Sequence, residues 1–189
     1  PDSVELARTP FFSQAEYQCG PAALATVLNA SGITVALETL TPQVYLPQRK
    51  GSLQAEMVAA TRRYGRVPYV LRPELTDLLA ELKAGTPVLV LQNLGLSLLP
   101  IWHYAVVIGY DVPSDSLLLR SGTEKNLRMT RHRFEASWDR AQRWALVTMP
   151  PTQIPVTATG TEWLQAASAF EELGQPVVAA EAYTAATRR

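Results

Sequence analysis

The order of hydrophobic patterns along the chain most restricts its fold. Apolar residues recur at helical spacing as far as residue 83, and after residue 86 they gather in strand-sized runs. The predicted helices cover residues 20–29, 52–64 and 74–83, with Ser52 as an N-cap, and the predicted strands cover 87–92, 103–110, 116–120 and 144–149. Helices followed by strands joined by short turns indicate an α+β fold with an antiparallel sheet.

Composition and charge narrow the functional classes. With 189 residues, 47% of them hydrophobic, the chain can hold one domain with a core and an appendage. Its 17 basic residues balance its 17 acidic ones, which argues against nucleic acid or an anionic membrane as the main partner. No apolar run approaches the ~18 residues of a membrane span. Two arginine groups, at 62, 63 and 66 and at 128, 131 and 133, are expected to be solvated.

The C-terminal part differs in composition. We expect a main domain over 1–150, a proline-punctuated linker over 151–160 and a helical hairpin over 161–189. Large and small residues match the register of a tetratricopeptide repeat at Trp163, Ala167, Phe170, Gly174, Ala179, Tyr183 and Ala186. A generic helical hairpin is the alternative. One repeat cannot bury both its faces, so the hairpin docks on the main domain or, as the pattern favours, continues past Arg189 with further repeats that recruit a protein partner.

Cys19, the only cysteine, stands where a polar segment turns into an apolar helix. A helix N-terminus favours a thiolate, which is the species that attacks carbonyl carbon. If Cys19 is a catalytic nucleophile, it should be alkylated well below the ~8.5 of a free thiol and should lose this reactivity in His103→Ala. Gln14 could donate its amide to the oxyanion that forms during such an attack. With one cysteine and two distant histidines, no metal cluster is expected, and no glycine-rich loop suggests a cofactor.

A thiol nucleophile needs a base, and the chain has only two histidines. His132 lies between Arg131 and Arg133 and is expected at the surface. His103 opens an apolar strand, where a histidine is often merely packed and hydrogen-bonded. It is nevertheless the only plausible base for the only thiol, and such partners are distant in sequence and adjacent in space.

The residues that carry these features also carry a resemblance. Gln14, the run Cys19-Gly20-Pro21-Ala22-Ala23 and the run His103-Tyr104-Ala105-Val106-Val107 resemble the C39 peptidase family of papain-like cysteine proteases, over residues 10–150. The chain is similar to a stand-alone bacterial branch followed by tetratricopeptide repeats. The resemblance implies a papain-like fold, Cys19 as nucleophile, His103 as base and then acid, and Gln14 with the Cys19 N–H as oxyanion donors.

The third catalytic group departs from the family pattern. The family has an Asp-Pro pair at the end of the strand after the histidine, whereas this chain has Ser121-Gly122. Asp111 and Asp115 are predicted to be turn residues at the far end of the strands. Ser121 could accept a hydrogen bond from the imidazole but cannot stabilise the imidazolium as a carboxylate does.

These observations predict a cysteine peptidase acting on a peptide or protein, with cleavage after small residues if Trp102, Tyr104 and Tyr17 narrow the cleft. The main alternative is a weak or inactive peptide-binding module that recruits partners through its repeats. Acyl transfer or amide hydrolysis on a small molecule would use the same groups. The absence of a starting methionine suggests a removed N-terminal segment, and hence a bacterial cell envelope or periplasm, with the cytoplasm as the alternative.

Overall fold

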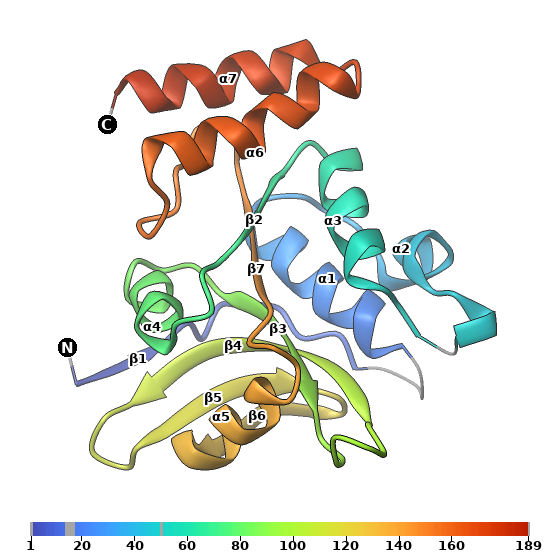
Figure 1. Ribbon diagram of the computed structural model, residues 1–189, viewed down its shortest axis with the longest axis vertical. Helices are drawn as coiled ribbons and strands as arrows, with labels where there is room; N and C mark the ends of the chain where they lie inside the picture. Colours follow the sequence, from blue (N-terminus) through green and yellow to red (C-terminus); the bar gives the residue numbers. More distant parts are fainter. Residues whose placement is uncertain (1, 14–17, 50, 189) are drawn as a thin grey trace.

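The computed structural model describes residues 2–13, 18–49 and 51–188. The helices are α1 (Cys19–Ala30), α2 (Leu37–Val44), α3 (Gln54–Arg63), α4 (Leu75–Lys83), α5 (Arg131–Asp139), α6 (Gly160–Glu172) and α7 (Pro176–Thr187), with a 3-10 turn η1 at Pro47–Arg49. The strands are β1 (Ser3–Glu5), β2 (Val67–Val70), β3 (Val88–Asn93), β4 (Trp102–Asp111), β5 (Ser116–Ser121), β6 (Glu124–Thr130) and β7 (Ala145–Met149). Figure 1 shows these elements in place.

All the strands belong to one antiparallel sheet in the order β2-β7-β3-β4-β5-β6. The first strand, β1, pairs with the far end of β4, from Gly109 to Asp111. That pairing requires a glycine, because a Cβ at Gly109 would lie 2.1 Å from the Val4 carbonyl oxygen. The α+β class and the antiparallel sheet predicted from the order of patterns are thus confirmed.

Alternate residues of the central strands face two separate cores. Leu89 of β3 and Val106 of β4 pack against α1, α2 and α3, whereas Val90 and Val107 face the other core, which includes α4 and α5. The near-continuous apolar character of β3 and β4 follows from this burial on both faces. The sheet is therefore the middle layer, and β4 is covered on both of its faces.

Several elements go beyond the predicted ones. The helices α2 and α5 and the strands β1, β2 and β6 have weak patterns: β6 alternates exposed and half-buried residues, and α5 is mostly polar. The prediction of Ser52 as an N-cap is wrong. The helix α3 begins at Gln54 after Leu53, and the Ser52 hydroxyl lies buried with no hydrogen-bond partner among the described residues.

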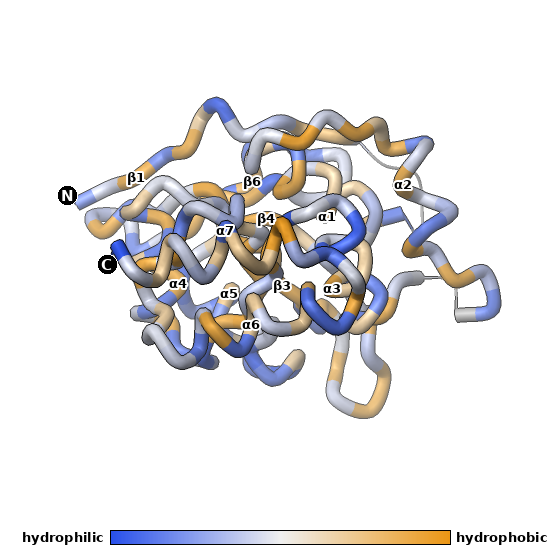
Figure 2. Tube along the Cα trace, turned by 90° about the horizontal axis from the view of Figure 1, so that it is seen from above, coloured by the Kyte–Doolittle hydropathy of each residue, from blue (hydrophilic) through white to orange (hydrophobic). Residues whose placement is uncertain are grey.

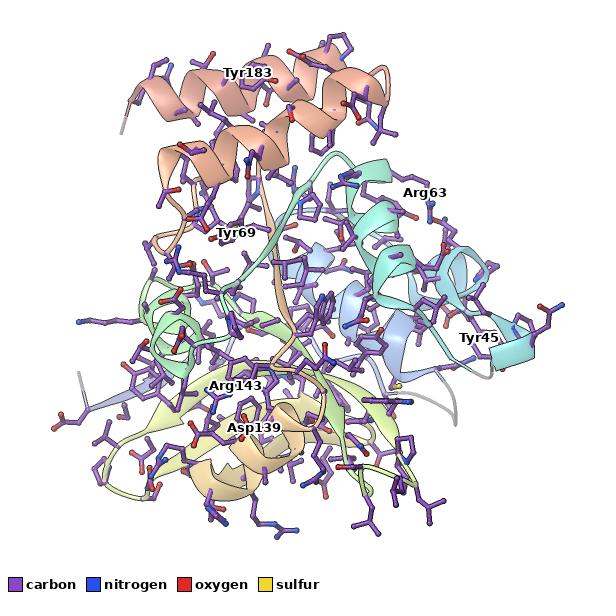
Figure 3. The ribbon with its side chains drawn as sticks, viewed as in Figure 1. Tyr45, Arg63, Tyr69, Asp139, Arg143 and Tyr183 are labelled. Atoms are coloured by element: carbon purple, nitrogen blue, oxygen red, sulfur yellow. The ribbon has the colours of Figure 1, made fainter. Side chains whose placement is uncertain are left out.

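The C-terminal helices α6 and α7 form a hairpin that docks on the main domain above β2 and β7 (Figure 1). Trp163 and Phe170 are fully buried and belong to the same core as the sheet residues Val67 and Val147. Tyr69 lies between the hairpin and the sheet (Figure 3), and its hydroxyl donates to Glu162 at 3.2 Å. The hairpin therefore docks on the main domain, which was the less favoured of the two expectations from the sequence.

Candidate functional site

Cys19 is the first residue of α1 and is half-buried. The next residue must be small, because a Cβ on Gly20 would lie 2.4 Å from Ser52 Oγ. The segment before α3 therefore packs directly against the first turn of α1, which carries the thiol. The Gln18 side chain does not cap this helix, so within the described part of the chain the first N–H groups of α1 remain available to the sulfur.

Two opposing effects act on the thiol. Burial, the larger effect, raises the pKa of Cys19, while backbone N–H groups of Tyr104, Gly20 and Cys19 itself lower it by hydrogen bonding. The net pKa lies above the ordinary value for cysteine. The N–H groups at the helix N-terminus do favour the thiolate, as expected, but desolvation outweighs them.

His103 is the second residue of β4, and its ring meets the end of β5. The Nε2 atom of His103 lies 2.7 Å from Ser121 Oγ. The structure thus brings together two of the residues singled out in the sequence, at the position where the family pattern has a carboxylate. Burial lowers the pKa of His103, so the imidazole is neutral at neutral pH.

The strand β4 carries both the imidazole and a backbone group that acts on the thiol. The N–H of Tyr104, which acts on the Cys19 sulfur, belongs to the residue directly after His103. Among the described residues no hydrogen bond joins Cys19 to His103 itself. The tyrosine side chain fixes the surroundings further, since its hydroxyl donates to the Ser52 carbonyl at 3.1 Å and its ring meets Trp144 edge-on.

Sequence reasoning missed the roles of Tyr104 and Ser52, which pack around the N-terminus of α1. The Tyr104 side chain is buried, so it packs inside the protein beside the site and does not narrow an open cleft. The signal for Ser52 was Gly20 itself, since a glycine just inside a helix indicates close approach by another segment. Both residues hold the α1 N-terminus against β4.

The remaining predicted residues fall as follows. Gln14 and Tyr17 lie outside the described residues. Asp111 ends β4 at the opposite end from His103, and Asp115 occupies the next turn, where it pairs with Arg131. His132 is exposed on α5. Asp111, Asp115 and His132 are therefore not part of the site around His103.

A cleft of about 550 Å³ opens beside the start of α1. It is lined by Gln18, Leu37, Glu38, Thr41, Pro42, Tyr45 and Pro47. Figure 3 shows Tyr45 close to η1, at the outer end of the α2 region. Among the described residues this lining is mixed apolar and polar and includes the carboxylate of Glu38, and the volume of the cleft is in the range of small-molecule and peptide sites.

Two further properties concern the described residues alone. In residues 2–13, 18–49 and 51–188, no group of three His, Cys, Asp or Glu side chains is placed to hold a metal ion. Over the same residues, every helix is too short or too polar to span a bilayer.

Comparison with known proteins agrees with this architecture. A C39-like peptidase from Bacillus anthracis superposes with a TM-score of 0.66 at 20% identity, over 79% of this chain and 98% of that one. The peptidase domain of Streptococcus ComA, a bifunctional ABC transporter of a quorum-sensing pathway, gives 0.57 at 21% identity, over 76% and 99%. A double-glycine-motif protease from an AMS/PCAT transporter, solved in complex with the leader peptide, gives 0.56 at 21%, over 75% and 91%. At such identities these likenesses show the fold.

No curated protein matches the sequence. A family profile does match, over residues 7–146, which include Cys19, His103 and Ser121. By that match the chain belongs to the Peptidase_C39 like family.

Proposed function

We propose that the protein is a cysteine peptidase in which Cys19 attacks the peptide carbonyl and His103 transfers the proton. The observation that carries the proposal is the hydrogen bond of 2.7 Å between His103 Nε2 and Ser121 Oγ. On the same strand as His103, the backbone N–H of the next residue, Tyr104, acts on the Cys19 sulfur. The Peptidase_C39 like family and the neighbouring peptidase folds support the same chemistry.

The hydrogen bond to Ser121 selects the tautomer that the reaction needs. If Nε2 carries the proton and donates it to Ser121 Oγ, then Nδ1 is left with a lone pair. Nδ1 would take the thiol proton as Sγ bonds to the carbonyl carbon. The imidazolium would then protonate the leaving amine as the C–N bond breaks, which leaves a thioester on Cys19.

Water completes the cycle. His103 would accept a proton from a water molecule that attacks the thioester carbon, and would give a proton to the Cys19 thiolate as the C–S bond breaks. The oxyanion formed in each half-reaction needs donors, and we assign this role to the backbone N–H of Cys19 and to the side-chain amide of Gln14. The assignment of Gln14 rests on its place five residues before Cys19 in the sequence.

The resting pair in this scheme is neutral. Burial raises the pKa of Cys19 and lowers that of His103, so both groups are uncharged at neutral pH and no ion pair is preformed. Ser121 can orient the ring, but it does not stabilise the imidazolium with a negative charge. Because the pair is neutral, the thiol proton has to move to His103 as the substrate is attacked. Because Ser121 carries no charge, it acts mainly as a positioning residue.

For the substrate we propose a peptide or protein segment with small residues before the cut. One neighbour with this fold is a double-glycine-motif protease solved with a leader peptide. The cleft beside α1 adjoins Gln18, the residue before Cys19, and is wide enough for a peptide segment. The carboxylate of Glu38 in this lining favours a neutral or basic segment there.

The test is cleavage of a peptide library followed by mass spectrometry. We expect new termini after Gly-Gly or Gly-Ala with the wild-type protein and none with Cys19→Ala or His103→Ala. Asp111→Asn is the matched control, because Asp111 lies at the other end of β4. Tight peptide binding with no Cys19-dependent product would instead favour a peptide-binding module.

We also propose that α6 and α7 form a tetratricopeptide-type pair that contacts a partner protein. Trp163 Nε1 donates to the Ala182 carbonyl at 2.8 Å, and the buried Ala167 and Ala179 let the helices approach closely. Gly174 takes a left-handed conformation (φ +71°) in the turn between them. The exposed side of α7, with Val177, is the surface for a partner, and Val177→Glu should abolish capture of that partner while peptide cleavage persists.

A further inference from the structure

The loop between β3 and β4, residues 94–101, exposes an unusual number of large apolar side chains. The large apolar side chains that are more than a third exposed in the loop, and in the first residue of β4 after it, are Leu94, Leu96, Leu98, Leu99, Ile101 and Trp102. Figure 1 shows the loop at the lower edge of the molecule, and Figure 2 shows hydrophobic residues along it where it projects from the body. Contiguous exposed apolar surface of this kind marks an interaction site.

Exposure is graded along the loop. It rises from 48% at Leu94 to 93% at Leu98 and falls again to 55% at Trp102. The apolar surface is therefore a convex tip whose outermost residue is almost completely solvated. A convex apolar tip suits a continuous apolar medium better than it suits a peptide, which binds in a concave site.

The backbone of the loop is largely satisfied within the hairpin. Leu94 N donates to the Ile101 carbonyl at 2.9 Å, and Leu96 and Leu99 exchange two bonds of 3.1 Å. The Asn93 side chain accepts from Gly95 N at 2.9 Å and Ile101 N at 3.0 Å and donates to the Leu96 carbonyl at 3.2 Å. A backbone with internal bonds of this kind loses little when water is removed, which is the main requirement for entering lipid.

Charge and aromatic placement point the same way. No charged residue occurs between Lys83 and Asp111, so the loop, the strand β3 and all of β4 except its last residue are uncharged. Trp102 is exposed at the base of the loop. Tryptophan is enriched at membrane–water interfaces, where the base of an inserted loop would lie. The N–H groups of Ser97 and Leu98 have no partner within the hairpin, which limits the depth to the carbonyl region of the lipids.

We propose that the β3–β4 loop inserts into the surface of a lipid bilayer and holds the His103 end of the sheet at the membrane. Because the loop is uncharged, binding should occur on zwitterionic lipid and should not weaken with salt. A single small apolar anchor gives weak, reversible attachment, so the protein would exchange between membrane and solution. The proposal does not depend on the chemistry at Cys19.

The test is sedimentation of the full chain with sucrose-loaded phosphatidylcholine vesicles. We expect the wild-type protein to sediment with lipid at low and high salt, and L98E/L99E to bind at least tenfold more weakly. The matched control is L164E/V177E, which places the same charges on exposed apolar residues of the α6–α7 hairpin and should bind as the wild type does. L98N/L99N, which adds no charge, should also lose binding.

Depth is tested with brominated phosphatidylcholine, which quenches tryptophan fluorescence on contact. Quenching should be present in the wild type and absent in Trp102→Phe, which should still sediment with the vesicles. Any of three results would overturn the proposal: no vesicle binding, binding that L98E/L99E leaves unchanged, or binding that salt abolishes. Self-association or peptide cleavage that depends on Leu98 and Leu99, without vesicle binding, would assign the loop to a second copy or to the substrate.

Discussion

His103 Nε2 faces Ser121 Oγ at 2.7 Å, so a hydroxyl occupies the position at which the family pattern has a carboxylate. A hydroxyl orients the ring but gives the imidazolium no compensating charge. The effect of burial on His103 is therefore unopposed, and the pKa of the imidazole is lowered. This contact underlies the predictions for the Ser121 variants and for the acid limb of His103.

Substitution of Ser121 should separate orientation from charge. Ser121→Ala removes one hydrogen bond of ~1 kcal/mol and should reduce kcat/KM about fivefold. Ser121→Asp supplies a negative charge that favours the imidazolium, so it should raise the pKa of His103 and raise kcat about tenfold. Peptide cleavage measured between pH 5 and 9 checks both results. Equal losses in the two variants would show that Ser121 is only a packed residue.

The pH dependence of Cys19 alkylation should reflect its burial. Because the pKa of the thiol is raised, the rate with iodoacetamide should increase with pH through a midpoint above the ~8.5 of a free thiol. His103→Ala should leave that midpoint nearly unchanged, since the imidazole is already neutral in this range. A rate plateau at neutral pH that disappears in His103→Ala would reveal a preformed ion pair and contradict the neutral resting state.

Proton transfer to His103 requires its neutral form. Because the pKa of His103 is lowered, the acid limb of kcat/KM should lie below pH 6.5, and activity should persist in mildly acidic solution. Ser121→Asp should move that limb to higher pH. A limb above pH 7 in the wild-type protein would mean that a charge partner, and not burial, controls His103.

Gly20 should tolerate no side chain. In Gly20→Ala the new Cβ would meet Ser52 Oγ at 2.4 Å, so α1 or the segment before α3 has to move. We expect the free energy of unfolding to fall by about 1–3 kcal/mol and cleavage to fall about a hundredfold, because the thiol is displaced. Gly160→Ala is the control, since nothing lies within 4 Å of its Cβ position, and it should change stability by less than about 0.5 kcal/mol. If Gly20→Ala behaves as Gly160→Ala does, the contact does not position the nucleophile.

The docked hairpin should be part of one cooperative unit. Trp163 is fully buried and hydrogen-bonded to Ala182, so Trp163→Ala should destabilise the whole protein by about 3–5 kcal/mol in urea. Leu164→Ala, at the exposed neighbouring position, should cost less than about 0.5 kcal/mol. A separate early transition in Trp163→Ala, with the main transition unchanged, would show that the hairpin unfolds by itself.

The parts of the fold predicted from sequence are those with strong periodic patterns. The helix at Cys19–Ala30 and the strands β3, β4 and β5 are buried on most of their residues, so their apolar patterns are dense. The helix α5 and strand β6 expose most of their surface, and α2 carries Pro42 within a short helix, so their patterns are sparse. Such elements form because the rest of the sheet is in place.

The site was predictable where chemistry restricts the residue type. One cysteine and one histidine on an apolar strand sufficed to propose the pair, and the end of β5 indicated Ser121. Tertiary contacts decided the rest: how deeply α1 buries the thiol sets the sign of its pKa shift, and no local pattern encodes that depth. The roles of Cys19, His103, Gln14 and Ser121 stay predictions until the variants are measured.

The pairing of the sheet also sets when the site can form during synthesis. Cys19 emerges from the ribosome long before His103, and β2 at Val67–Val70 finds its partner only when β7 at Ala145–Met149 has been made. Such contacts between distant parts of the sequence make folding slow. A nascent chain that ends before β4 carries Cys19 without His103, so under the proposed mechanism the growing polypeptide would not cleave itself or its neighbours until the domain is nearly complete.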